Sequence, residues 1–384
     1  MGEFQSLLLV LAAIYLAECF VWIRRGALAF GRWWRADFGL CQSGVLWANQ
    51  RGGLTLANPL PPLGTVFLSA PFPLSLAPDA AYAHSATSLS IGGRPIQTGQ
   101  HLCFDDFKSI EADGRRVLVN DKLFLLALSP FEARRLAQSL RRLKQLPAKE
   151  RAAAIREQIS ESLDQDKISA RLEQLKMRAR TIRLLSNGLF LYLFVLAPAG
   201  VWRLGLAQIV WFLLGGMLAQ TISIAILFQR AHRSLYPDGR EERFTPFLTM
   251  LLAPPTAIRA GDILSCHLLE HFHPLAVARV LCAPDQFKDF ARQILLDLRF
   301  PMLPVCPTIE PGPVETERWF RAFHQEAVEK FATRSGLKLD ELLKPPEPSE
   351  PSNLSYCPRC HAQFVTREGT CADCGGRALV PFTA

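Results

Sequence analysis

Long apolar runs without charge dominate the hydrophobic pattern of this chain. Residues 184–202 and 204–228 contain no charged side chain, and only Arg203 separates them. A helix that crosses a bilayer needs about 20 apolar residues, each adding about 1.5 Å of length. A third apolar run covers 6–23. The pattern therefore predicts an integral membrane protein with three transmembrane α-helices, an N-terminal anchor followed by a helical hairpin.

The run at 6–23 has the flanks of an uncleaved anchor rather than those of a secretory signal peptide. Signal peptides begin with a basic region, and residues 1–5 contain no Lys or Arg. Glu18 is the one acidic residue inside a predicted span. It indicates either an ion or proton site or a carboxylate near the helix end that Arg24 and Arg25 neutralise. We favour the neutralised carboxylate.

The distribution of Lys and Arg around the spans predicts their orientation. Twelve basic residues flank them on one side, and Arg203 alone lies on the other. The twelve are Arg24, Arg25, Arg32, Arg35, Lys176, Arg178, Arg180, Arg183, Arg230, Arg233, Arg240 and Arg243. We therefore expect an outside N-terminus in a bacterial-type cytoplasmic (inner) membrane, with residues 24–183 and 229–384 in the cytoplasm.

Charge and cysteine content refine this expectation. The formal net charge is +8, and much of it is the juxtamembrane basic set, which suits anionic lipid better than nucleic acid. The chain has 10 cysteines. In a mostly cytoplasmic protein they stay reduced, so they are free thiols or metal ligands rather than a disulfide framework.

The first cytoplasmic part, 26–146, is predicted to be an α+β domain, rich in β-strands and closed by a helix. Runs at 115–119 and 123–128 flank Asn120-Asp121, a pattern typical of a β-hairpin. Ser129-Pro130-Phe131-Glu132 is a capping box with proline at the first helical position, and it predicts a helix that runs to Leu146.

The next stretch, 149–183, is charged and predicted to be helical up to the membrane. Its apolar residues follow a coiled-coil-like spacing. They are Ile168, Leu172, Leu175, Ala179 and Ile182. This seam (168–182) is too short to fix an oligomer, so it packs either against the same molecule or, together with the transmembrane helices, in a homo-oligomer.

The region 229–343 is predicted to be helical. Its run at 244–255 is too short to span a bilayer, so it lies on the membrane or in a soluble core. An amphipathic helix at 314–334 has a broad aromatic face, which we assign to the core. The proline-rich stretch 344–353 is a linker that we expect to hold 354–384 at a distance.

Two CxxC pairs in the last 31 residues carry the clearest chemical signal. Cys357, Cys360, Cys371 and Cys374 supply four thiolates at the spacing of a tetrahedral metal site. Pro358 and the Gly375-Gly376 pair match the zinc-ribbon family, which this segment resembles over about 354–382, although His361 stands where a glycine often follows the first pair. The resemblance implies one structural Zn²⁺ per chain, which would supply the folding energy of so small a unit.

A weaker pattern lies at His267-Leu-Leu-Glu270-His271. It matches the HxxEH string of inverzincin metallopeptidases, in which two histidines bind zinc and the glutamate is the general base. On a helix His267 and His271 would share one face, with Cys266 and His273 nearby. That family also needs a downstream acidic ligand, for which the candidates are Glu310, Glu315 and Glu317. A surface or packed histidine pair is the alternative that we favour.

The sequence favours binding over catalysis. A closed four-cysteine site leaves no open coordination position for a reaction, and the chain contains no phosphate-binding glycine loop, GxSxG or kinase motif. We expect a membrane-anchored scaffold or regulatory adaptor whose partners are the lipid bilayer and a protein that binds the ribbon. The alternatives are a membrane-bound zinc metallohydrolase and, less favoured because the ribbon's charge is mixed, a tether for nucleic acid.

Overall fold

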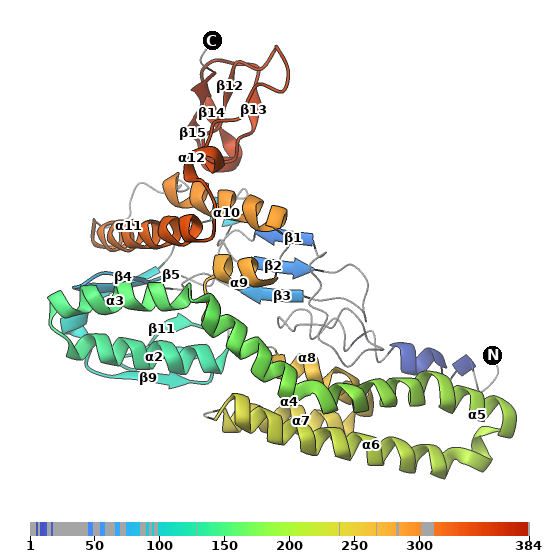
Figure 1. Ribbon diagram of the computed structural model, residues 1–384. Helices are drawn as coiled ribbons and strands as arrows, with labels where there is room; N and C mark the ends of the chain where they lie inside the picture. Colours follow the sequence, from blue (N-terminus) through green and yellow to red (C-terminus); the bar gives the residue numbers. More distant parts are fainter. Residues whose placement is uncertain are drawn as a thin grey trace.

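The computed structural model describes residues 5–6, 8–13, 17, 45–48, 54–57, 66–69, 74–84, 90–91, 94–95, 99–127, 129–237, 239–265, 267–281, 284–300 and 311–382. Over these ranges the chain combines long helices with small antiparallel sheets. A body of strands and helices carries a long helical hairpin at one end and a small C-terminal unit at another (Figure 1).

Two three-stranded antiparallel sheets form the β part of the body. The first contains β4 (Leu74–Leu76), β5 (Ala80–His84) and β8 (Gly99–Cys103), and the second contains β9 (Ile110–Asp113), β10 (Arg116–Val119) and β11 (Lys122–Leu126). The predicted hairpin is confirmed as β10–β11. Asn120 and Asp121 join the two strands with φ of 53° and 62°, as a type I′ turn requires.

The predicted closing helix is α2 (Pro130–Gln145), followed by α3 (Ala148–Ser162). The Ser129 hydroxyl accepts the Glu132 amide at 3.1 Å, which confirms the N-terminal cap. Apolar residues of both helices and of the two sheets form one buried cluster. The helical members of this cluster are Ala133, Leu136, Ala137, Leu140, Leu143, Ile155, Ile159 and Phe320.

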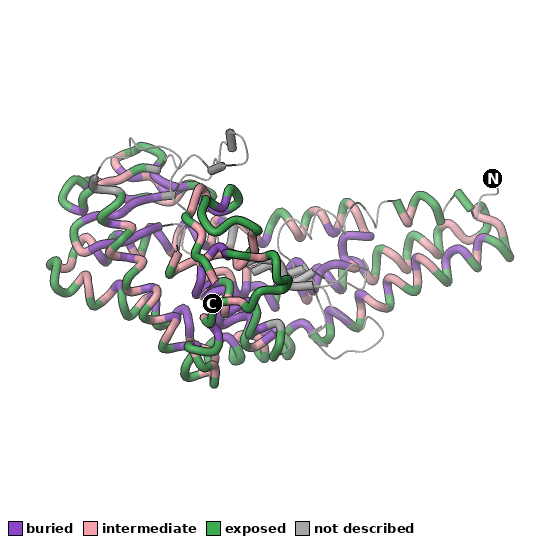
Figure 2. Tube along the Cα trace, turned by 90° about the horizontal axis from the view of Figure 1, so that it is seen from above, coloured by how far each residue is buried: buried purple, intermediate pink, exposed green. Residues whose placement is uncertain are grey.

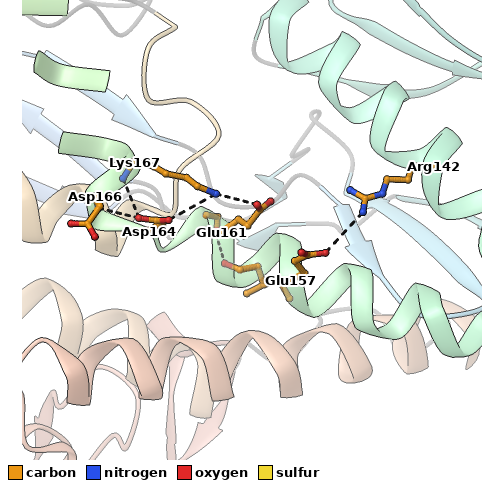
Figure 3. Close-up of polar contacts among 8 residues, drawn as sticks. Arg142, Glu157, Glu161, Asp164, Asp166 and Lys167 are labelled. Carbon is orange, nitrogen blue, oxygen red and sulfur yellow. Dashed lines mark hydrogen bonds and ion pairs between the residues drawn. The ribbon is translucent and has the colours of Figure 1, made fainter. Parts of the chain in front are cut away.

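The charged stretch at 149–183 is helical and consists of two helices, because a capping residue begins a new helix within it. α4 (Gln165–Leu191) begins after a two-residue break that follows α3. Asp164 Oδ1 accepts hydrogen bonds from the amides of Asp166 and Lys167, both at 3.0 Å (Figure 3). Lys167 Nζ also donates to Glu161 Oε1 at 3.0 Å. The Asp164 carboxylate thus satisfies amides that a new helix leaves without partners.

The helical hairpin consists of two long apolar helices side by side (Figure 1). α4 continues through one π-helical turn, η2 (Tyr192–Leu196), into α5 (Ala197–Leu204), and α6 (Leu206–Leu235) returns along it. These helices, of 40 and 30 residues, are long and apolar enough to cross a membrane, a test that core helices of soluble proteins can also pass. The first arm therefore runs from the body to the tip without a break.

The hairpin turns at Gly205, two residues beyond the separator Arg203 that the charge pattern singled out. Gly205 has φ 77° and ψ 151°, a conformation that is essentially restricted to glycine. The sequence predicted a tight hairpin with its link at Arg203. The turn lies at Gly205 because it depends on backbone freedom and not on charge.

Substitution of Gly205 by alanine is expected to destabilise the hairpin by about 1–3 kcal/mol through backbone strain. The matched control is Gly215→Ala in α6, where an added Cβ meets nothing within 4 Å and the helix propensity of alanine is favourable. Thermal unfolding of both variants in detergent measures the difference. Equal stability of the two variants would contradict the strain at Gly205.

Only part of the predicted anchor at 6–23 falls in the described residues. Residues 8–13 are helical, and Leu11 packs against the buried cluster that includes the hairpin. The N-terminus lies beside the α5 end of the hairpin in both views (Figures 1 and 2). Glu18 and most of the second half of the run lie outside the described residues.

The predicted seam on α4 packs inside the same chain. Ile168, Leu175, Ala179 and Ile182 are at most 1% exposed, and Leu172 packs against the same buried cluster. Of the two interpretations left open by the spacing, the structure therefore shows the intramolecular one for these residues.

The region after the hairpin is helical, as predicted. It contains α7 (Arg240–Leu252), a 3₁₀ segment η3 (Pro254–Arg259), α8 (Ala260–Ser265), α9 (Pro274–Leu281), α10 (Pro284–Arg299), α11 (Pro311–Arg334) and α12 (Leu339–Leu342). The aromatic face of α11 is in the core, as expected. Phe320 joins the β cluster and Phe331 the hairpin cluster, so α11 connects the two.

The remaining strands of the predicted 26–146 domain form separate sheets. They are β1 (Val45–Ala48), β2 (Leu54–Ala57) and β3 (Val66–Ser69) in one sheet, and β6 (Ser90–Ile91) and β7 (Arg94–Pro95) in another. The β1–β2–β3 sheet contacts α9 and α10 rather than joining the sheets that α2 covers (Figure 1).

Candidate metal centre

The C-terminal unit brings the four predicted cysteines together at its centre. Short strands frame them: β12 (Ser355–Tyr356), β13 (Gln363–Phe364), β14 (Thr370–Cys371), β15 (Arg377–Ala378) and β16 (Val380–Pro381). Cys357, Cys371 and Cys374 are buried, and Cys360 is more exposed. Phe364 and Leu379 are the apolar side chains that pack against them.

Each CxxC pair forms a turn that points its sulfur atoms inward. The His361 amide donates to Cys357 O at 2.9 Å, and the Gly376 amide donates to Cys371 O at 3.0 Å. His361 adopts φ 60° and Gly375 φ 71°, so both turns use the left-handed region. The histidine that departs from the ribbon pattern therefore makes the turn that a glycine usually makes.

The sulfur geometry fits a metal ion. All four Sγ atoms lie within 4.8 Å of one another, and the Sγ atoms of Cys360 and Cys371 are 3.8 Å apart. Tetrahedral coordination with metal–sulfur bonds near 2.3 Å implies sulfur separations of about 3.8 Å. Among the described residues, this is the one group of histidine, cysteine and acidic side chains found close enough to hold a metal ion.

Burial favours the neutral thiol in the absence of a metal. It raises the pKa of the Cys360 and Cys374 thiols above the usual range. At Cys357 burial is outweighed by backbone hydrogen bonds from Arg359 and Cys360, and the pKa is lowered. A bound dication reverses this preference because a coordinating thiol is deprotonated. Metal binding here therefore releases protons and strengthens as the pH rises.

The unit is docked on the helical body, which corrects the expectation that the 344–353 linker holds it at a distance. Arg359, inside the first CxxC pair, donates to Asp297 Oδ1 on α10 at 2.8 Å. Arg292 of α10 contacts His361 Nδ1 at 2.6 Å. The same Arg359 places Nη1 3.7 Å from Cys374 Sγ, so it connects the cysteine cluster directly to α10.

The linker is itself held against the ribbon. Gln363 Nε2 donates to Glu347 O at 2.7 Å, and Gln363 Oε1 accepts from the Ser349 amide at 2.8 Å. The Arg377 guanidinium lies 5.5 Å from the centre of the Phe300 ring at the end of α10. The proline-rich composition predicted a solvated spacer. Composition does not report these contacts between residues far apart in the chain.

Substitution of Asp297 by alanine is expected to loosen the ribbon from α10 while its metal stays bound. It removes a charge-assisted hydrogen bond, a class worth about 1.5–3 kcal/mol. Amide hydrogen exchange at 292–300 and 355–382 should rise. The matched control is Asp289→Ala, an exposed carboxylate on the same helix, and equal exchange in the two variants would contradict the docking.

The HxxEH string does not form the helical pair that its spacing suggests. The described residues of the string lie in turns between α8, which ends at Ser265, and α9, which begins at Pro274. Glu270 Oε1 is 2.5 Å from His267 Nδ1, and Glu270 Oε2 accepts from Ser129 Oγ at 2.5 Å. Glu270 therefore connects this turn to the N-terminus of α2 through one carboxylate oxygen and contacts His267 within the turn through the other. Cys266 lies outside the described residues.

The other candidates from this pattern also have structural surroundings. His271 is half-buried, and its pKa falls to about 3 through desolvation and then through the charge of Arg135. Glu317 forms an ion pair with Arg321 one turn along α11, and Glu315 is exposed. Glu310 lies outside the described residues.

A buried histidine pair was not expected from the sequence. His273 Nε2 and His324 Nε2 are 2.8 Å apart, and both side chains are buried. His273 Nδ1 accepts the Leu275 amide at 3.1 Å, so its proton lies on Nε2 and is donated to His324. The available signal was His324 on the apolar face of the helix at 314–334, but nothing local paired it with His273.

The structure thus supports the coarser part of the ribbon prediction: four cysteines at 357, 360, 371 and 374 that could hold a metal ion. The arrangement is compatible with zinc. Comparison with models of protein families, with curated proteins and with solved structures found no match.

Proposed function

We propose that this protein is anchored in a bacterial-type cytoplasmic membrane and acts as a scaffold or regulatory adaptor, binding another protein through a zinc ribbon at the inner face. The observation that carries the proposal is the closed four-cysteine cluster. Four thiolates occupy all four coordination positions of a tetrahedral zinc ion, so no position is open to substrate or water. The metal is then structural, and the ribbon offers a surface rather than a reaction.

The hairpin surface supports the membrane anchor. Large apolar side chains on both arms are exposed, as lipid contact requires. They are Leu184, Leu191, Val195, Leu196, Trp202, Leu204, Trp211, Phe212, Leu214, Leu218, Ile222 and Ile226. The charge-free arm from Leu184 to the tip covers about 30 Å at 1.5 Å per residue, which matches the hydrocarbon thickness of a bilayer.

The position of the basic residues supports the orientation. Arg203 lies at the tip of the hairpin, and the described basic residues of α4 and α6 lie toward its base. This distribution favours a cytoplasmic location for the body and the ribbon. Alkaline extraction should leave the full chain in the membrane fraction, and a reporter fused to the C-terminus should be active only inside. Release into the soluble fraction would overturn the anchor, and outside activity would overturn the orientation.

The three-stranded sheet of the ribbon offers exposed apolar side chains to a partner. Leu354 and Val365 flank the paired residues of β12 and β13 and are 39% and 65% exposed. Val380 on β16, across the same sheet, is 38% exposed. Two arginines of the ribbon, Arg359 and Arg377, contact Asp297 and Phe300 of the body. Because they face the body, they are not available to bind phosphate groups, which favours a protein partner over nucleic acid.

A photocrosslinking amino acid at Val365 of the full chain tests the adaptor role in cells. We expect a discrete crosslinked protein that disappears when Cys371→Ser unfolds the ribbon. The same probe at Met177, an exposed residue of α4, is the matched control. No protein crosslink at Val365, or one that survives Cys371→Ser, would overturn the proposal.

A further inference from the structure

Helix α7 carries an apolar stripe that is exposed in the described part of the structure. No charged side chain occurs between Phe244 and Ile258. Phe244, Leu248 and Leu252 follow one another every four residues, which places them on one face, and they are 64%, 42% and 77% exposed. Fifteen residues are too few to cross a bilayer as a helix, but enough to enter one leaflet and return.

The contacts of α7 set its depth relative to the hairpin. α7 packs against α6, and Gln229 Nε2 donates to Arg243 O at 3.1 Å. Because the chain reverses near Tyr236, residues equally distant from that turn lie at the same level. Phe244 is then level with Phe228, the last residue of the charge-free run, and Leu252 lies about 12 Å deeper at 1.5 Å per residue.

The return path reaches the other arm close to the start of its charge-free run. Ser186 Oγ donates to Ala257 O at 2.9 Å, and Ser186 is the third residue of the charge-free run on α4. The 3₁₀ turn that reverses the chain is enclosed by protein, with Thr256 and Ala257 fully buried. Irregular backbone at membrane depth is tolerated where protein buries it, as here.

Four arginines mark one boundary for all four segments. Arg183 precedes the run on α4, Arg230 follows the run on α6, and Arg243 and Arg259 bracket the α7–η3 segment. The two contacts just described hold these ends at matching levels. Arg230 is exposed and suits the headgroup layer of the cytoplasmic face. The side chains of Arg183, Arg243 and Arg259 are buried in the protein at the same level.

From this register we infer that 244–258 is a re-entrant segment, whose stripe of Phe244, Leu248 and Leu252 lies among the acyl chains of the cytoplasmic leaflet. Ile222 and Ile226 on α6, the helix against which α7 packs, are also exposed. The depth of the stripe, about 12 Å, fits one leaflet of about 15 Å. The Thr249 hydroxyl donates to Thr245 O at 2.8 Å, so this side chain needs no water. The inference rests on the proposed membrane hairpin.

The test uses a diazirine amino acid at one position of the full chain, reconstituted in vesicles of phosphatidylethanolamine and phosphatidylglycerol. The probe replaces Leu252, and lipid adducts are read by mass spectrometry after illumination. Leu218, 49% exposed on α6, reports on the hairpin, and Leu126, 42% exposed on β11, is the cytoplasmic control. We expect lipid adducts when the probe is at Leu252 or Leu218 and no lipid adducts when it is at Leu126.

The other outcomes separate the two ideas. Adducts at Leu218 without adducts at Leu252 would overturn the re-entrant segment and leave the hairpin standing. Adducts at neither position would overturn both. A crosslink from Leu252 to a second copy of the chain, in place of lipid, would assign the stripe to a protein interface and also overturn the inference.

Discussion

Substitution of Cys371 by serine is expected to unfold the ribbon at 355–382 and to release its metal, while the rest of the chain stays folded. The apolar core of the ribbon is three buried cysteines with Phe364 and Leu379 packed against them, which is too little to stabilise a unit of this size. Structural zinc supplies apparent binding energies of about 10–16 kcal/mol in small domains. Loss of one ligand therefore removes most of the folding energy of the ribbon.

Metal content and hydrogen exchange together measure this effect in the detergent-purified protein. We expect one zinc per full-length chain, none in Cys371→Ser, and unprotected amides at 355–382 in the variant. Cys103→Ser is the matched control, because Cys103 is an exposed cysteine on β8, outside the cluster. It should keep both the metal and the protection.

Truncation after Lys344 decides whether a second metal site exists. The truncated chain should contain no metal, since the described residues bring no other set of possible ligands together. Metal that persists after truncation would contradict this and point to His267 and His271. The hydrolase interpretation would then regain support, and Glu270→Ala would be the next variant to assay.

Local patterns in the sequence predicted local structure well. The Asn120-Asp121 turn, the Ser129 cap and the two CxxC turns each depend on a few consecutive residues, and each forms as expected. The two long apolar helices follow from composition in the same way. Their lipid contacts remain a proposal, because composition reports apolarity and not the surrounding solvent.

Errors arose where a local cue was overlooked or a contact was distant. The helical pattern at 149–183 did not mark the boundary at Asp164, which caps the second of the two helices there. The docking of Arg359 on Asp297 joins residues 62 positions apart, which no periodicity reports. The HxxEH spacing implied a helix, whereas Ser129 and His267 fix Glu270 in a turn.

Protonation of the buried His273–His324 pair is expected to make the folded state unstable in mild acid. Burial lowers the pKa of His324 to about 4 and that of His273 well below 6.5, with the neighbouring histidine also lowering His273. In the unfolded chain both titrate near 6.5. The unfolded state therefore binds more protons below that pH, so stability is complete above pH 6.5 and declines as the pH falls toward 4.

The expected slope is about 1.4 kcal/mol per pH unit for each histidine that stays neutral when folded. His324→Gln keeps an acceptor for the His273 Nε2 proton and removes one titrating group, so it should reduce the slope by about that amount. Guanidinium unfolding in detergent at several pH values between 6.5 and 4, followed by tryptophan fluorescence, measures it. Acid loss of the metal affects both proteins equally and cancels in the difference.

Thr333→Ala, on the exposed face of α11, is the matched control and should leave the slope unchanged. Equal slopes of stability against pH for the wild-type chain and His324→Gln would show that the pair accepts a proton within the folded state. The assignment of a buried neutral pair would then be wrong. A reduced slope would mean that α9 and α11 stay joined only while both imidazoles are uncharged. Since α11 connects the β cluster to the hairpin cluster through Phe320 and Phe331, acid would then loosen the body from the hairpin.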